Sequence, residues 1–275
     1  MRNEKKIKIN LPKTLQVLRK LPIPKKLGVL GRIYSKKLAK NGVGWVKTSA
    51  GPVWKLDLRN STHRWIVFGD YEGPGFIRWA RKWVKAGSVV VDSGANIGQV
   101  LLYLAPKIKT GKYLAFEPFP PAREWLRECL QGYEEWPVQI EELGLGERVD
   151  TASLGGQWGG ESAVGSHTEL KIGQGEIKIT TLDSYAKING LEKIRLWKLD
   201  MEGGEYAALK GAQKLLKDKA IEAVVLETEF DRFKEVRDML GGYGYLPFTW
   251  NGKKIKSDKV SSFENVLFLA SKRLV

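Results

Sequence analysis

The sequence has very few of the residues that form disulfides or bind metals through sulfur and imidazole. Among its 275 residues there is one cysteine, Cys129, and there are two histidines, His63 and His167. One cysteine excludes an intramolecular disulfide and a cysteine-rich zinc cluster. Two histidines are too few for a histidine-based metal site unless carboxylates complete it, so no metal site is predicted. A single thiol suits a reducing compartment, and we therefore expect a cytoplasmic protein.

Long apolar runs are absent as well. No stretch approaches the roughly 18–20 consecutive apolar residues of a membrane-spanning helix. The first residues include Arg2, Glu4 and Lys5, and no continuous apolar segment follows them. This pattern does not fit a cleaved signal peptide.

Basic residues are abundant, and their excess over acidic residues is confined mainly to one end of the chain. The sequence holds 46 Lys and Arg against 31 Asp and Glu. Residues 1–40 contain 13 of these bases and one acid, Glu4, whereas the other 235 residues contain 33 bases and 30 acids. A near-neutral body argues against nucleic acid as the partner. The basic leader is expected either to contact anionic lipid at the inner face of a membrane or to be a flexible, solvated tail.

The patterning divides the chain into a basic helical leader (1–43), a β and helical extension (44–86) and an α/β core (87–275). Pro22 and Pro24 cannot lie inside one helix, which predicts two short helices in the leader. The alternating runs between Gly44 and Phe68 predict a small hairpin or meander. A helix is then predicted over residues 74–85, and its buried face is formed by Phe76, Ile77, Trp79, Trp83 and Val84.

In the core, strands and helices alternate. The predicted strands cover residues 88–91, 112–116, 138–142, 177–181, 194–199, 221–228, 245–250 and 266–270. The predicted helices cover residues 96–105, 121–130, 182–188, 205–216 and 230–240. The segment 144–175 has nine glycines and predicts loops and minor strands. The alternation indicates a doubly wound α/β sheet with a mostly parallel interior.

The turn after the first core strand has the composition of a ligand-binding turn. It reads Asp92-Ser-Gly94-Ala-Asn96-Ile-Gly98, and open α/β sheets bind ligands at this end of a central strand. The spacing differs from the Gly-x-Gly-x-x-Gly fingerprint of dinucleotide sites. A carboxylate at Asp92 would repel a pyrophosphate, whereas it would attract the ammonium and sulfonium groups of S-adenosylmethionine.

A second acid, Glu117, ends the next predicted strand, 23 residues after Gly94. This is close to the spacing at which an acid binds ribose hydroxyls in this topology, and a carboxylate can accept from both hydroxyls. In the alternative interpretation, the glycines form an ordinary tight turn and Glu117 caps the following helix.

Several of these segments together resemble the FkbM-type methyltransferases in order and spacing, over about residues 65–270. The segments that carry the resemblance are Val89–Gly98, Phe116-Glu117-Pro118, Thr181-Leu182-Asp183, Lys198–Glu205 and Leu209–Ala212. The resemblance implies a Rossmann-like class I methyltransferase fold with a seven-stranded sheet, bound S-adenosylmethionine, and O-methylation of a sugar, glycan or secondary metabolite. The residues expected to bind the cofactor are Asp92, Gly94, Asn96, Gly98, Glu117, Pro118 and Glu142, the last at a position where the family commonly has Asn.

Three carboxylates near the fourth strand of the sheet are candidates for the chemistry. Asp200 is expected at the strand tip, Glu202 in the turn and Glu205 at the start of a helix. They could supply a general base, orient a hydroxyl, or hold a divalent cation, which is not predicted. The macrodipole alone could explain Glu205. His167 is either a mobile base or a solvated loop histidine, and Asp200, Glu202 and His167 are the catalytic candidates.

Two other functions stay open at this point. The basic leader suggests an RNA methyltransferase, although no RNA-binding module is evident. The second alternative is a membrane-surface protein with an inactive methyltransferase fold, against which the intact Asp92, Gly94, Glu117 and Asp200 argue.

Overall fold

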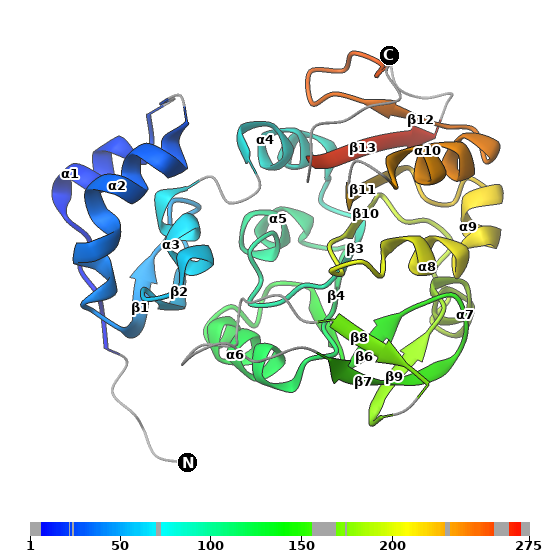
Figure 1. The fold of residues 1–275 in the computed structure, drawn as a ribbon, viewed down its shortest axis with the longest axis horizontal. Coiled ribbons are helices and arrows are strands. Elements are labelled where there is room, and N and C mark those ends of the chain that lie inside the picture. Colours follow the sequence, from blue (N-terminus) through cyan, green and yellow to red (C-terminus); the bar gives the residue numbers. More distant parts are fainter. Residues whose placement is uncertain are drawn as a thin grey trace.

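The computed structural model describes most of the chain, and its elements are shown in Figure 1. The described residues are 7–21, 23, 25–69, 73–155, 169–173, 175–228, 232–255 and 264–270. Within these ranges, no helix is both long enough and apolar enough to cross a membrane.

A seven-stranded sheet forms the centre of the molecule, as predicted. Its strand order is β12-β13-β11-β10-β3-β4-β5. The strands are β3 (Val89–Ser93), β4 (Lys112–Phe116), β5 (Val138–Glu141), β10 (Leu196–Leu199), β11 (Ala223–Thr228), β12 (Tyr245–Phe248) and β13 (Glu264–Ala270). The strands from β5 to β11 pair in parallel, and β13 is antiparallel to both β11 and β12. Since the chain runs outward from β3 to β5 and then returns to β10, the strand order reverses between β3 and β10, where such sheets bind ligands.

Helices cover both faces of this sheet because its strands are apolar on both faces (Figure 1). Val90 and Tyr113 pack in one core cluster with residues of α4, α5 and α6. Val91 and Leu114, their neighbours in sequence, pack in the other with residues of α7, α8, α9 and α10. These helices are α4 (Gly73–Trp83), α5 (Leu101–Ile108), α6 (Pro120–Leu130), α7 (Leu182–Ile188), α8 (Glu205–Lys210), α9 (Gln213–Lys217) and α10 (Phe233–Gly242). The doubly wound prediction is confirmed.

The glycine-rich segment contributes to a separate four-stranded sheet, with order β6-β9-β7-β8. Its strands are β6 (Leu143–Leu145), β7 (Asp150–Gly155), β8 (Glu169–Ile172) and β9 (Ile177–Thr180). The predicted strand at residues 177–181 therefore exists, but it lies outside the central sheet.

Two predicted core helices are shortened or interrupted in the structure by glycine-containing turns. The helix expected over residues 96–105 begins only at Leu101, because Gly94, Asn96 and Gly98 have φ angles of 80°, 47° and 82°, which no right-handed helix accommodates. The helix expected over residues 205–216 is divided into α8 and α9 around Gly211. A Cβ atom on Gly211 would lie 2.0 Å from the carbonyl oxygen of Gly146, so this backbone is in close contact with its neighbour.

The leader and extension form α1 (Lys13–Leu18), α2 (Lys26–Ala39), β1 (Val43–Lys47), β2 (Val53–Asp57) and α3 (Ser61–Phe68). The two leader helices and the β1–β2 hairpin agree with the sequence prediction. The strand-like reading of residues 65–68 was wrong, because they belong to α3, where the side chain of Asn60 accepts a hydrogen bond from the Thr62 N–H (2.8 Å) as an N-cap.

The described leader residues pack against the rest of the protein. Leu15, Leu30 and Leu38 are buried in the same core cluster as Val46 and Leu56 of the hairpin. This part of the leader is therefore folded, and its contacts differ from those of a solvated tail.

Candidate functional site

The turn after β3 lies against the end of β10. The Asp200 N–H donates to the carbonyl oxygen of Ser93 (3.0 Å). A Cβ atom on Gly94 would lie 1.8 Å from the carbonyl oxygen of Asp200. Only glycine fits at this position, because the two backbones are in contact and the φ angle of Gly94 is left-handed.

Glu117, at the end of β4, is hydrogen-bonded directly to this turn. Its carboxylate is buried and accepts from the backbone N–H of Asn96 (2.8 Å) and of Phe119 (2.8 Å). Burial raises the pKa of Glu117 to about 7, although these hydrogen bonds oppose the shift. The bond to Asn96 joins the two predicted cofactor elements. The bond to Phe119, just before α6, shows that Glu117 also orders the start of that helix.

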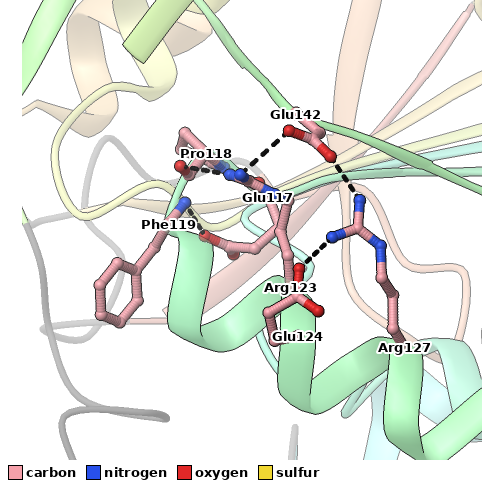
Figure 2. A network of polar contacts seen from close by, with 7 residues as sticks. All are labelled: Glu117, Pro118, Phe119, Arg123, Glu124, Arg127 and Glu142. Carbon is pink, nitrogen blue, oxygen red and sulfur yellow. Dashed lines mark hydrogen bonds and ion pairs between the residues drawn. The ribbon is translucent and has the colours of Figure 1, made fainter. Parts of the chain in front are cut away.

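Arg123 of α6 connects Glu117 to Glu142, as Figure 2 shows. Its buried guanidinium donates to the carbonyl oxygens of Glu117 (3.2 Å) and Pro118 (2.7 Å) and to the carboxylate of Glu142 (3.1 Å). Glu142 is exposed and also pairs with Arg127, and the hydrogen bond from Arg127, with the charge of Arg123, lowers its pKa. Glu142 therefore contacts α6, and its link to Glu117 runs through Arg123. Its predicted contact with a cofactor stays a prediction.

A buried lysine lies on the sheet among carboxyl groups. Lys198 of β10, 1% exposed, is in register with Asp92 of β3, 2% exposed. The Lys198 Nζ donates to the Asp200 Oδ2 (3.0 Å), and the Tyr113 hydroxyl donates to the Asp92 Oδ2 (2.6 Å). Burial raises the pKa of Asp92 to about 6, against the opposing charge of Lys198.

Glu227 of β11 completes this charged group. Its carboxyl is hydrogen-bonded to Asp200, and burial, followed by the charge of Asp200, raises its pKa to about 7. Lys198 thus interacts with three carboxyl groups near the strand ends, Asp92, Asp200 and Glu227, and its charge also acts on Glu205. When all three are ionised the group carries excess negative charge, which favours a cationic ligand.

Residues 92–247 match the Methyltransferase FkbM domain, and this range contains the turn, Glu117 and the charged group around Lys198. The chain belongs to this family. The strand order and the antiparallel β13 are those of a Rossmann-like class I methyltransferase, so the fold implied by the resemblance is confirmed.

The relative and the two solved structures described next share little sequence identity with this chain. Methyltransferase 1 of Beauveria bassiana (strain ARSEF 2860) is 26% identical over 144 residues, which are 45% of this chain and 58% of that protein's length. An rRNA methylase from Streptococcus thermophilus has a TM-score of 0.44 and 14% identity, covering 71% of this chain and 94% of its own. A TehB-like SAM-dependent methyltransferase from Corynebacterium glutamicum has a TM-score of 0.42 and 14% identity, covering 78% and 97%. Similarity this low does not indicate what the present chain acts on.

Glu205 and the catalytic candidates Glu202 and His167 differ in their surroundings. Glu205 accepts from the N–H groups of Met201 (2.6 Å) and Gly203 (3.1 Å), so its carboxylate holds the turn before α8, and burial raises its pKa. Glu202 is exposed in that turn, with a left-handed φ of 53°. His167 lies outside the described residues. In the described part of the chain, no three His, Cys, Asp or Glu side chains are grouped to hold a metal ion.

Trp54, in the hairpin of the extension, packs against the turn after β3. Its contact with the turn was not predicted from the sequence. Its indole Nε1 donates to the carbonyl oxygen of Ile97 (2.7 Å), and both residues are fully buried. A Cβ atom on Gly98 would lie 3.0 Å from the Trp54 ring and 2.8 Å from Leu126. The extension is therefore part of the structure that fixes the turn.

Glu227 and Lys198 were also missed as site residues, although the sequence contains a signal for Glu227. It follows the apolar run Val224-Val225-Leu226 near the end of a predicted strand. The rule that selected Asp200, an acid at the carboxyl end of a parallel strand, applies equally to it. Lys198 has no such signal, because a lysine inside a strand is usually exposed.

Proposed function

We propose that this chain is an S-adenosylmethionine-dependent methyltransferase that transfers a methyl group to a hydroxyl of a small-molecule or glycan acceptor. The observation that carries the proposal is the buried Glu117 carboxylate, hydrogen-bonded to the turn at Asn96 beside the point where the strand order reverses. Membership of the FkbM family supports the same assignment.

The donors and acceptors of this region fit that cofactor. Glu117 retains lone pairs that can accept from ribose hydroxyls after its two backbone bonds are made. Among the described residues, the buried Asn96 Oδ1 has no hydrogen-bond partner, so a ligand donor would satisfy it. The carboxylates around Lys198 would attract an ammonium group, and they would disfavour the phosphates of a dinucleotide.

S-adenosylmethionine would supply an electrophilic methyl group on a sulfonium. Transfer to an alcohol forms a C–O bond, breaks a C–S bond and releases the hydroxyl proton. In this proposal Asp200 accepts that proton, because its side chain is 26% exposed, whereas that of Asp92 is buried. Glu227 shares a hydrogen bond with it and can take up the proton, since its pKa is near 7.

The proposal is tested by methyl transfer from labelled S-adenosylmethionine to fractionated glycan and metabolite extracts, with RNA as a parallel acceptor. We expect label in an extract fraction, at an alkali-stable ether, and none in RNA. The control is Glu117→Ala, which should lose the transfer. Label in RNA alone would show that the acceptor is RNA and not a small molecule or glycan. Absence of label in every fraction would support a methyltransferase fold without activity.

A further inference from the structure

The helix α2 has an inward face and an outward face that are both partly apolar. Leu30, Tyr34 and Leu38, spaced four residues apart, are buried against the rest of the protein. On the other side Val29 is 39% exposed and Ile33 is 58% exposed. Large apolar side chains gain nothing by facing water, so this outward stripe has no role in the folding of the described chain.

Basic side chains flank this stripe. At 100° per residue, Arg32 and Lys36 lie on one side of Val29 and Ile33, and Lys37 lies on the other. All three basic side chains are exposed, and none has an ion-pair partner among the described residues. Residues 7–40 contain ten Lys and Arg and no Asp or Glu. The surface of α2 is therefore an apolar stripe between two positive margins, with no acid nearby in sequence to neutralise it.

The short helix α1 repeats this pattern beside α2. Val17 is 61% exposed and Leu21, just beyond the helix, is 44% exposed, with exposed Lys13 and Lys20 beside them. The two helices are held together, because the Tyr34 hydroxyl donates to the Thr14 Oγ1 (2.8 Å) and the Lys26 Nζ donates to the Arg19 carbonyl oxygen (3.1 Å). They are thus presented on a folded support, on the side of the molecule that Figure 1 shows away from α7 to α10.

We propose that α1 and α2 bind the surface of a lipid bilayer that contains anionic lipids. The lysines fit the negative headgroup layer, and the exposed Val and Ile side chains fit the boundary between headgroups and acyl chains, as in helices that lie in the interfacial plane. Nucleic acid would satisfy the charge but would leave the apolar stripe in water. The proposal concerns a surface remote from the cofactor turn, and it does not depend on the reaction proposed above.

The test is flotation of the full-length protein with vesicles of phosphatidylcholine, alone or mixed with phosphatidylglycerol. We expect binding to the mixed vesicles only, weakening as salt is raised, since screening shortens the range of the attraction. Arg32→Gln/Lys36→Gln/Lys37→Gln should weaken binding about 100-fold, at about fivefold for each basic residue. The matched control is Lys187→Gln/Lys193→Gln/Lys217→Gln, which removes the same charge elsewhere and should change binding less than about twofold.

A second variant, Val29→Gln/Ile33→Gln, separates this proposal from pure charge attraction. It keeps every charge and replaces exposed side chains, so its melting temperature should match that of the wild type, while its vesicle binding should fall at least about tenfold. Unchanged vesicle binding in this variant would overturn the proposal, as would absence of vesicle binding in the wild type. Tight binding of polyuridylate by both proteins, without vesicle binding, would identify the surface as one for RNA.

Discussion

Replacing Trp54 by Phe should weaken both the fold and the cofactor site. The change removes the 2.7 Å hydrogen bond to the Ile97 carbonyl oxygen, which then stays buried without its donor. Such a group costs about 1–3 kcal/mol, and the smaller ring leaves a cavity worth about 1 kcal/mol. We therefore expect the free energy of unfolding to fall by about 2–4 kcal/mol. Because Ile97 lies inside the turn, affinity for S-adenosylhomocysteine should also fall, by about tenfold or ~1.4 kcal/mol.

The chain provides a matched control for this experiment. Trp83 of α4 donates a similar hydrogen bond (2.9 Å) to the carbonyl oxygen of Arg195, which lies just before β10, at the opposite end of that strand from Asp200. Trp83→Phe should lower stability in urea unfolding without lowering affinity in calorimetry. If Trp54→Phe binds S-adenosylhomocysteine as tightly as the wild type, or if the two variants lose affinity equally, the extension does not fix the turn.

Two further predictions concern the carboxyl groups. Burial raises the pKa of Glu117 and Glu227 to about 7 and of Asp92 to about 6, so the folded protein binds these protons more tightly than the unfolded chain. The free energy of unfolding of the ligand-free protein should therefore fall as the pH rises from about 5 to about 7.5. Urea unfolding across this range should show a shallower fall for Glu227→Gln than for the wild type. An equal dependence on pH in the two proteins would refute the raised pKa of Glu227. Asp200→Asn keeps the shape of the side chain, so single-turnover methyl transfer should slow about 100- to 10,000-fold while affinity for S-adenosylhomocysteine is retained. Near-wild-type transfer would remove Asp200 from the chemistry, and loss of wild-type activity on chelation would reassign it to metal binding.

The elements that the sequence predicted best are those whose apolar residues recur at the spacing of one type of secondary structure. Residues 112–116 and 182–188 form a strand and a helix with the predicted bounds, because their apolar spacing matches one type of structure. Residues 65–68 were misread as extended because four apolar residues fit a strand and a buried helix face equally well. Asn60, a capping residue before them, is the local signal that decides for the helix.

The candidate site likewise has parts that the sequence predicted and parts that it did not. The pairing of the turn with Glu117 follows from strand order and spacing, and the structure contains the hydrogen bond that joins them. The support from Trp54 could not be predicted, because it links residues 43 positions apart through a hairpin whose docking is set by tertiary packing. For the same reason the position of Glu142 opposite Arg123 and Arg127 of α6 was not foreseen.

The central claim is that Glu117 binds the ribose of S-adenosylmethionine, and calorimetric titration with S-adenosylhomocysteine tests it most directly. Glu117→Ala should weaken binding by about 1.5–3 kcal/mol, the range for hydrogen bonds to a charged group. The exposed Glu135→Ala should have no effect, and NAD should not bind to the wild type. Equal affinity in the wild type and Glu117→Ala, or preferential binding of NAD, would contradict the account.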